Sequence, residues 1–239
     1  MRLHRFFIEE RIGDKKEITL IDDNLLHQWR TVFRMKPGDL LILLDNTGFE
    51  FLSRITNMTR KDVTLFVEEK TENKTRPKRE VFLFQSLIKK NNFEWLLEKA
   101  TEIGVSHIRP VIGDRSEKKG INFATNFDRE KNRAKKIITE ACEQSGRGKL
   151  PALYEPMDLE EAICCYSFPI IAFHPLGRPF DAAEFEKEKT IGVLIGPEGG
   201  WSVRECEFFN EKKVRIISLG SATLRSETAA LAASSLLLL

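Results

Sequence analysis

Three charged side chains near the carboxyl-terminal end of the chain could carry out chemistry: Glu198, Arg225 and Glu227. A cation beside a carboxylate can stabilise an anionic substrate and hold its leaving proton. Arg225 and Glu227 are two residues apart, so an ordinary structural ion pair is the alternative interpretation of these two. The three side chains can act together only if the segments that carry them face a common cavity.

Both charged segments follow apolar runs that are typical of buried strands. Residues 191–195 lead into the glycine-rich segment 196–200, and residues 214–219 lead into the polar segment 220–228. The glycines permit close backbone approach and positive φ, and Pro197 stiffens the exit from the strand. Two such strand ends predict a paired ligand-binding edge, because ligands of open α/β sheets bind at the carboxyl ends of strands.

Two of these features also have a plain structural interpretation. Ser202 and Glu205 have the spacing of a capping box, so the first loop could be a turn that leads into a helix. His174 follows the apolar run 169–173 and could lie at the same ligand-binding edge or be an ordinary surface residue. Both choices stay open at this point.

The carboxyl-terminal two thirds of the chain alternates between strand and helix patterns, which predicts an open, mostly parallel α/β sheet. The expected strands are residues 81–88, 107–112, 169–173, 191–195 and 214–219. A first helix is expected to start from a cap at Asn91 or Asn92 and to end at Gly104. The other expected helices are residues 128–145, 202–210 and 227–239.

The first 69 residues have a different pattern, of short strands separated by turns, which predicts a small, mostly β, barrel-like module. Asp22 or Asp23 would cap one short helix. Residues 70–80 contain no apolar residue other than Pro77, which indicates a linker. The expected strands are residues 3–8, 17–21, 39–45, 49–56 and 63–68, with a hairpin turn at 46–48.

Positive charge is concentrated in the middle of the chain. The formal net charge is only +2, but residues 74–151 carry 18 basic and 10 acidic side chains. Such a zone is typical of a surface that faces a polyanion, and a solvated face is the alternative interpretation. On the helix 128–145, the buried stripe is expected to consist of Ala134, Ile137, Ile138, Ala141 and Ser145.

An adjacent face of that helix mixes cations with other polar side chains. At about 100° per residue it contains Arg133, Lys136, Glu140 and Gln144. Arg147 would continue the face if the last turn extended. Such a face can grip phosphates and read a base edge, although a solvated helix would show the same pattern. Arg115 would extend the surface together with Lys118 and Lys119.

Composition and missing motifs argue against several classes of protein. With 41% hydrophobic and 31% charged residues, the chain is typical of a globular protein, and no apolar segment approaches the roughly 20 residues that span a bilayer. Residues 2–9 lack the apolar block of a signal peptide, so we expect a cytoplasmic location. Neither a G-x-G-x-x-G motif nor a complete P-loop is present. The four cysteines lack zinc-ligand spacing, so we expect mostly buried thiols and no metal.

The segments GPEGGWS at residues 196–202 and LGSATLRSETA at residues 219–229 resemble the paired carboxyl-terminal motifs of the SPOUT superfamily. More narrowly, they resemble the RsmE-type methyltransferases, which methylate N3 of a uridine in small-subunit ribosomal RNA. Residues 221–224 depart from the pattern, because the family more often has a bulkier, proline-containing approach to the Leu-Arg pair. Further similar positions are His27 and residues 32–34, 37–39, 99–105, 115–116 and 140–147.

The resemblance implies an α/β protein with an N-terminal PUA-like β-barrel over residues 1–73 that binds RNA. It implies a C-terminal SPOUT α/β domain over residues 74–239, which is tied in a deep trefoil knot and forms a homodimer. The cofactor would be S-adenosylmethionine, and no metal would be required. The residues implied to hold the cofactor are His174, Ile195, Gly196, Pro197, Gly199, Ser218, Leu219, Gly220 and Leu224.

The resemblance also implies a substrate, small-subunit ribosomal RNA within the assembled 30S subunit. Uridine N3 is a poor nucleophile until its proton leaves, so Arg225 would stabilise the anion and Glu198 or Glu227 would accept the proton or orient the base. A non-enzymatic RNA-binding module remains an alternative, as does a SPOUT enzyme acting on transfer RNA, which fits the two motifs less well. The RNA-binding residues would be Arg5, Arg34, Arg115, Arg133, Glu140, Gln144 and Arg147.

Overall fold

The computed structural model describes residues 3–117 and 127–239, so the predicted surface residues Lys118 and Lys119 lie outside the described part. The chain divides into two compact units. The first unit consists of Met1–Arg76 together with Cys142–Lys149, and the second consists of Pro77–Ala141 together with Leu150–Leu239. Each unit is described by itself below.

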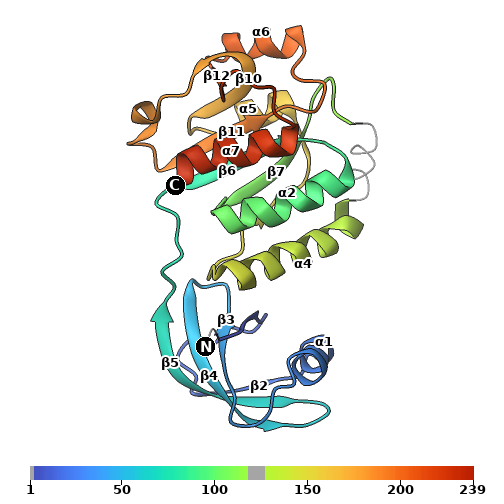
Figure 1. The fold of residues 1–239 in the computed structure, drawn as a ribbon, viewed down its shortest axis with the longest axis vertical. Helices are drawn as coiled ribbons and strands as arrows, with labels where there is room; N and C mark the ends of the chain where they lie inside the picture. Colours follow the sequence, from blue (N-terminus) through green and yellow to red (C-terminus); the bar gives the residue numbers. More distant parts are fainter. Residues whose placement is uncertain (1–2, 118–126) are drawn as a thin grey trace. The chain divides into compact units, whose positions relative to one another are not determined.

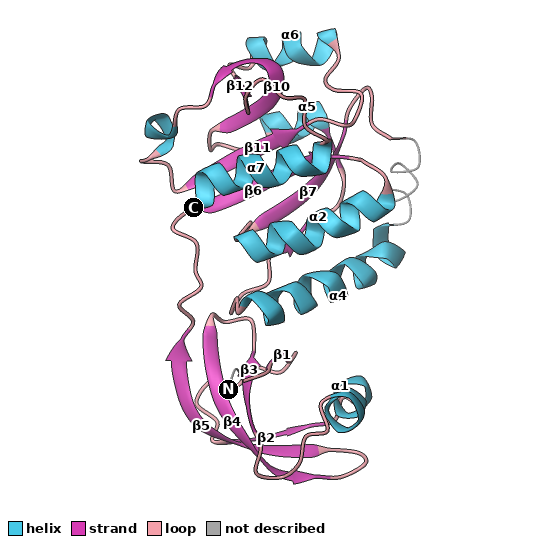
Figure 2. Ribbon diagram, viewed as in Figure 1, coloured by secondary structure: helices cyan, strands magenta, loops and turns pink. Residues whose placement is uncertain are grey.

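The first unit contains a five-stranded sheet with the strand order β1-β3-β4-β5-β2, which curls in Figure 2. The β1 and β3 strands pair in parallel, and the other neighbours pair antiparallel. The prediction that residues 70–72 belong to a linker is wrong, because their backbone pairs with β4 and this pairing needs no apolar side chain. The strands are β1 (Arg5–Phe7), β2 (Glu17–Leu20), β3 (Leu40–Leu44), β4 (Phe49–Met58) and β5 (Val63–Glu72).

A short helix packs against this sheet and fills its core. Helix α1 (Asp23–His27) starts from Asp22, whose carboxylate accepts hydrogen bonds from the backbone N–H groups of Asn24 and Leu25. The cap is therefore Asp22 and not Asp23. The helix continues into a π-helical turn, η1 (Gln28–Val32), which buries Trp29 completely against Phe6, with their ring centroids 5.0 Å apart.

The second unit contains a seven-stranded sheet in which all the paired strands run parallel, as the alternating pattern predicted. The strand order is β12-β10-β11-β6-β7-β8, and β9 also pairs with β7. Two of the strands, β8 and β9, are two-residue bridges that no periodicity predicted. The strands are β6 (Glu80–Ser86), β7 (His107–Ile112), β8 (Ala152–Leu153), β9 (Met157–Asp158), β10 (Ile170–Pro179), β11 (Thr190–Ile195) and β12 (Arg215–Ser218).

Helices lie on both faces of this sheet (Figure 1). Helices α2 and α7 pack against each other, and α7 contacts β6 and β11. On the other face, Phe82 and Phe84 of β6 share a core with the buried side chains of α5 and α6. The helices are α2 (Lys90–Ile103), α4 (Phe127–Ser145), α5 (Leu159–Cys164), α6 (Val203–Glu211) and α7 (Ser226–Leu238), with a 3₁₀ turn, η2 (Ala182–Phe185).

The ends of these helices test the predicted caps. Helix α6 has the predicted capping box between Ser202 and Glu205, and α2 ends at Gly104 in the left-handed conformation with φ of 113°. The cap predicted at Asn91 or Asn92 is wrong, because α2 begins at Lys90 without any side-chain cap.

No helix in the described residues is long and apolar enough to cross a membrane.

The four cysteines differ in exposure. Cys142 is buried, and burial raises the pKa of its thiol to about 12. Cys206 is partly buried, whereas Cys164 and Cys165 are exposed. The expectation that most of the thiols are buried is therefore wrong, because these two lie at the end of α5, beyond the face that buries Leu159, Ala162 and Ile163.

The β10 strand bulges beside β12, and a glycine permits the close approach. Both Phe173 and Arg178 of β10 pair with Ile217 of β12, so the four residues between them leave the regular ladder. A Cβ atom at Gly177 would lie 2.5 Å from the backbone carbonyl carbon of Ile217. Only a glycine fits there without moving one of the two strands.

We expect Gly177→Ala to lower the free energy of unfolding by about 1–3 kcal/mol, because the added methyl group overlaps backbone that cannot rotate away. Urea titration followed by circular dichroism measures the effect. Gly199→Ala is the matched control, since its Cβ atom would lie 3.5 Å from Arg115, at ordinary contact distance, and a change within about 0.5 kcal/mol is expected. Equal stability of the two variants would contradict the close approach at Gly177.

Candidate functional site

A cavity of about 330 Å³ lies at the carboxyl ends of three neighbouring strands, β10, β11 and β12. The register explains its position, because Phe173 pairs with both Ile195 and Ile217, so the regular part of β10 ends level with β11 and β12. The volume falls within the range of small-molecule sites, about 300–1,000 Å³. The lining residues are Phe173, His174, Pro175, Ile195, Gly196, Pro197, Glu198, Gly200, Trp201, Ser218, Leu219, Gly220, Ala222, Thr223, Leu224, Arg225, Ser226 and Ala229.

Most of the residues predicted to hold a cofactor line this one cavity. The exception is Gly199, which does not line it and whose carbonyl group accepts a hydrogen bond from Arg115 instead. His174 lies at the end of the regular part of β10, where its Nδ1 atom accepts a hydrogen bond from the backbone N–H of Leu176. The predicted residues that line the cavity are His174, Ile195, Gly196, Pro197, Ser218, Leu219, Gly220 and Leu224.

The three charged residues predicted to do chemistry have different positions. Arg225 and Glu198 line the cavity and are exposed. In the described part of the chain, the Arg225 guanidinium makes no hydrogen bond or ion pair, so Arg225 and Glu227 do not form the structural pair considered above. Glu227 is only 8% exposed and does not line the cavity, and its Oε2 atom is buried without a hydrogen-bond partner among the described residues.

A buried hydrogen-bond chain fixes the start of the loop after β11. The Ser226 hydroxyl group donates to the carbonyl oxygen of Gly196 over 2.5 Å and accepts from the Gln85 amide over 2.9 Å. Gln85 is fully buried and Ser226 nearly so. Sequence analysis missed both residues, although a polar Gln85 within the apolar run 81–88 was a signal that could have been followed.

Trp201 joins the same loop to β10 and forms part of the cavity wall. Its indole N–H donates to the Phe173 carbonyl oxygen over 3.0 Å. Its ring meets the Phe209 ring of α6 edge-on, with the centroids 5.2 Å apart. This residue is 4% exposed, so the loop cannot move away from the strand ends without disrupting the core beneath it.

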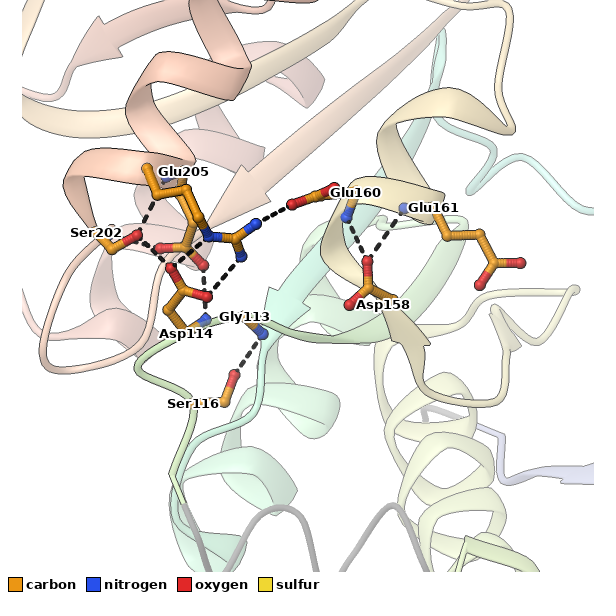
Figure 3. A network of polar contacts seen from close by, with 9 residues as sticks. Gly113, Asp114, Ser116, Asp158, Glu160, Glu161, Ser202 and Glu205 are labelled. Atoms are coloured by element: carbon orange, nitrogen blue, oxygen red, sulfur yellow. Dashed lines mark hydrogen bonds and ion pairs between the residues drawn. The ribbon is translucent and has the colours of Figure 1, made fainter.

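Charged residues tie the loop after β7 to the start of α6 (Figure 3). Glu205 is buried, and its two carboxylate oxygens accept from the backbone N–H groups of Asp114 and Ser202, over 2.8 Å and 2.6 Å. Asp114 accepts from Arg204 over 2.6 Å and from the Ser202 hydroxyl over 2.5 Å. The Arg204 guanidinium, and then the Ser202 hydroxyl, lower the pKa of the Asp114 carboxyl below its ordinary value. Arg204 also pairs with Glu160 of α5.

The residues predicted to bind RNA are divided between the two units. In the first unit, Arg34 is exposed with a φ of 54°, whereas Arg5 is partly buried in an ion pair with Glu50. Arg147 is 5% exposed, and it does not continue the helix face because α4 ends at Ser145.

The remaining predicted RNA-binding residues are accessible to solvent. Gln144 is exposed near the end of α4. Glu140 is exposed and lies 3.9 Å from Lys136. Arg133 is exposed, but its guanidinium binds both carboxylate oxygens of Glu94 over 2.6 Å and 2.7 Å. An RNA phosphate at Arg133 would therefore have to compete with Glu94.

Comparisons with known proteins match two family models to separate parts of the chain. A family model described as an RNA methyltransferase domain matches residues 74–238, and one described as an RNA methyltransferase PUA domain matches residues 30–68. The chain is 28% identical to ribosomal RNA small subunit methyltransferase E of Rickettsia conorii over 98% of its length and 94% of the relative. It is 31% identical to ribosomal RNA small subunit methyltransferase E 2 of Borreliella burgdorferi, over 89% and 87% of the two chains.

The fold is also similar to a solved structure with a ligand. The crystal structure of a ribosomal RNA small subunit methyltransferase E from Neisseria gonorrhoeae, bound to S-adenosyl methionine, superimposes with a TM-score of 0.85 at 25% identity. The match covers 98% of this chain and 96% of the other. Both units of the chain therefore have counterparts in a single known protein.

We expect Ser226→Ala to lower the free energy of unfolding by about 1–3 kcal/mol, because it leaves the buried Gln85 amide and the Gly196 carbonyl without their shared partner. Urea titration measures the change. Thr223→Ala, at an exposed position of the same cavity, is the control and should stay within about 0.5 kcal/mol of the wild-type value. A Ser226→Ala variant as stable as this control would show that the chain of hydrogen bonds contributes nothing.

Proposed function

Because this chain belongs to the RNA methyltransferase family, alongside the ribosomal RNA small subunit methyltransferase E proteins, we propose that it methylates small-subunit ribosomal RNA. The proposed methyl donor is S-adenosylmethionine, and the proposed acceptor is N3 of one uridine. The observation that carries the proposal is the cavity at three strand ends, because its wall includes an arginine with no ionic partner among the described residues.

The cavity suits the proposed donor in size and in chemistry. Its wall is built largely from apolar side chains, such as Ile195, Leu219 and Leu224, together with the backbone of glycine-containing loops. Apolar walls can enclose a flat base, while exposed backbone N–H and C=O groups recognise its polar edge. S-adenosylmethionine supplies an activated methyl group when it is bound. Residues of this chain must then hold the acceptor base and stabilise its charge.

Arg225 is proposed to stabilise the negative charge that develops on the uridine. N3 of uridine carries a proton, and it becomes a good nucleophile only as that proton leaves and the imide anion forms. A guanidinium that is not neutralised by a neighbouring carboxylate stabilises such an anion more effectively than one in an ion pair. The side chain of Arg225 fulfils this condition and lies at the cavity wall.

The structure separates the two carboxylates that could handle the proton. Glu198 is exposed and lines the cavity, so a base that enters can reach it directly. Glu227 is buried outside the cavity wall, within the first turn of α7. We therefore assign the proton-accepting role to Glu198 and an orienting role to Glu227, which follows Arg225 by two residues.

RNA contacts are proposed for four exposed members of the predicted set, Arg34, Arg133, Glu140 and Gln144. Arg115 is also exposed, but its guanidinium binds two backbone carbonyl groups. Arg5 and Arg147 are better suited to structural roles, because one is ion-paired and the other is buried. We also propose a PUA-like barrel, a trefoil knot, a homodimer, the assembled 30S subunit as substrate and a cytoplasmic location of the protein. The parallel order β12-β10-β11-β6 is compatible with such a knot.

Labelling with tritiated S-adenosylmethionine tests the function. Small subunits from a strain that lacks the enzyme are incubated with the purified protein, and the modified base is mapped. We expect label in the small-subunit RNA, at N3 of a single uridine, and more label in assembled subunits than in free RNA. Wild-type subunits, whose site is already methylated, are the control and should take up little label.

Other outcomes would refute parts of the proposal. Label at a cytidine would contradict the uridine assignment, and label in transfer RNA would favour the alternative substrate. Calorimetry that detects RNA binding but no binding of S-adenosylmethionine or S-adenosylhomocysteine would favour a non-enzymatic RNA-binding module.

We expect Arg225→Ala to reduce kcat by about 100-fold or more, because the charge on the base is then stabilised by solvent alone. Binding of S-adenosylmethionine, measured by calorimetry, should stay close to the wild-type value, since the cavity wall keeps its backbone and its apolar side chains. Arg225→Lys should recover part of the activity because it restores the positive charge. Near-normal turnover by Arg225→Ala, with the cofactor bound, would show that another group stabilises the anion.

A further inference from the structure

The loop after β11, residues 196–202, is called the cofactor loop here. Its backbone has left the sheet, so its polar groups need partners from elsewhere in the unit. Ser226 of α7 binds the Gly196 carbonyl, and Glu205 of α6 binds the Ser202 N–H. The carbonyl groups of Gly199 and Trp201 lie between these two attachment points. Both are bound by a single side chain, Arg115.

Arg115 makes these two contacts with one nitrogen atom. Its Nη1 atom donates to the Gly199 carbonyl oxygen over 2.9 Å and to the Trp201 carbonyl oxygen over 3.2 Å. A hydrogen bond from a charged donor is stronger than one between neutral groups. The backbone between the two carbonyls includes Gly200 at a φ of 67°, which few other residues adopt. The guanidinium therefore bridges the part of the loop that contains a glycine at positive φ.

The backbone that carries Arg115 is itself held firmly. The N–H of the preceding residue, Asp114, donates to the buried carboxylate of Glu205, and the N–H of Gly113 donates to the Ser116 hydroxyl over 2.8 Å. Figure 3 shows that the first contact joins this loop to the start of α6, whereas the second lies within the loop. Glu205 thus fixes both the base of Arg115 and the end of the cofactor loop, so the guanidinium meets its two carbonyl groups within one rigid frame.

We infer that Arg115 is a positioning residue, which holds residues 199–201 of the cofactor loop in the shape that binds S-adenosylmethionine. This inference rests on the proposed function. The inferred role differs from the RNA contact predicted for Arg115 from the sequence, because it concerns cofactor binding in the absence of RNA. Without the guanidinium, Gly199 and Gly200 would sample many conformations, and binding would have to order them.

Calorimetry with S-adenosylmethionine alone tests the inference, with filter binding of a small-subunit ribosomal RNA transcript as the second measurement. We expect Arg115→Ala to raise the Kd for S-adenosylmethionine about tenfold, which corresponds to about 1.4 kcal/mol, and to leave the Kd for RNA close to that of wild type. Activity should show a raised KM for S-adenosylmethionine with kcat nearly unchanged at saturation. Arg129→Ala, at an exposed arginine of α4, is the matched control and should bind the cofactor normally.

Each other outcome has a definite meaning. Unchanged cofactor binding with weakened RNA binding would overturn the inference and make Arg115 an RNA contact. If Arg115→Ala fails to fold, Arg115→Lys provides the test. An ammonium group cannot reproduce the guanidinium geometry, so we expect this variant to raise the Kd for S-adenosylmethionine about threefold. Unchanged affinity in that folded variant would overturn the inference. If the wild-type protein binds no S-adenosylmethionine, the proposed function itself is wrong. If the wild-type protein binds it normally and the variants bind it equally well, only this inference is wrong.

Discussion

The candidate site depends on the parallel pairing of three strands whose carboxyl ends lie at the same level. Phe173 of β10 pairs with Ile195 of β11 and with Ile217 of β12. Because parallel strands point the same way, the loops that follow these residues all leave on one side of the sheet. A slip of one residue would turn every side chain of a strand to the other face. The buried side chains on both faces of β11 prevent such a slip and so keep the three loops together.

Beyond the strand ends, backbone groups form hydrogen bonds with side chains instead of with neighbouring strands. The cofactor loop is bound by Ser226 from α7, by Arg115 from the loop after β7 and by Glu205 from α6. These residues come from parts of the chain that are far apart in sequence. The shape of the cavity is therefore a property of the whole second unit. This explains how a loop rich in glycine can form one wall of a preformed pocket.

Local patterns were sufficient to predict much of this fold. The parallel sheet, most strand positions and the two strand-end loops follow from hydrophobic periodicity and from glycine and proline placement, which depend on neighbouring residues. The contacts that hold the site do not follow from such local patterns. Gln85 and Ser226 are 141 residues apart, and nothing local to either reveals the other. The pattern likewise indicated that Arg115 is a cation, but not that its guanidinium faces two carbonyl groups 84 and 86 residues away.

Errors in the predicted boundaries have a similar origin. Residues 70–72 have no apolar side chain, yet they extend β5 because the partner strand β4 continues beside them. Asn91 and Asn92 are good caps, but α2 begins one residue before Asn91, where Lys89 still has an extended backbone with ψ of 139°. In the first case the pairing with β4 outweighs a weak local preference. Such errors shift the end of an element by a few residues and do not change its type.

The start of α7 shows why one residue can matter at the site itself. Arg225 has an extended backbone, with φ of −64° and ψ of 153°, and the helix begins only at Ser226. Both residues line the cavity. The Ser226 hydroxyl is buried and binds the Gly196 carbonyl, whereas the Arg225 side chain is exposed and has no ionic partner among the described residues. The start of α7 therefore supplies the cavity wall with a serine that supports the loop and, one residue before it, with a cation that is not neutralised by a carboxylate.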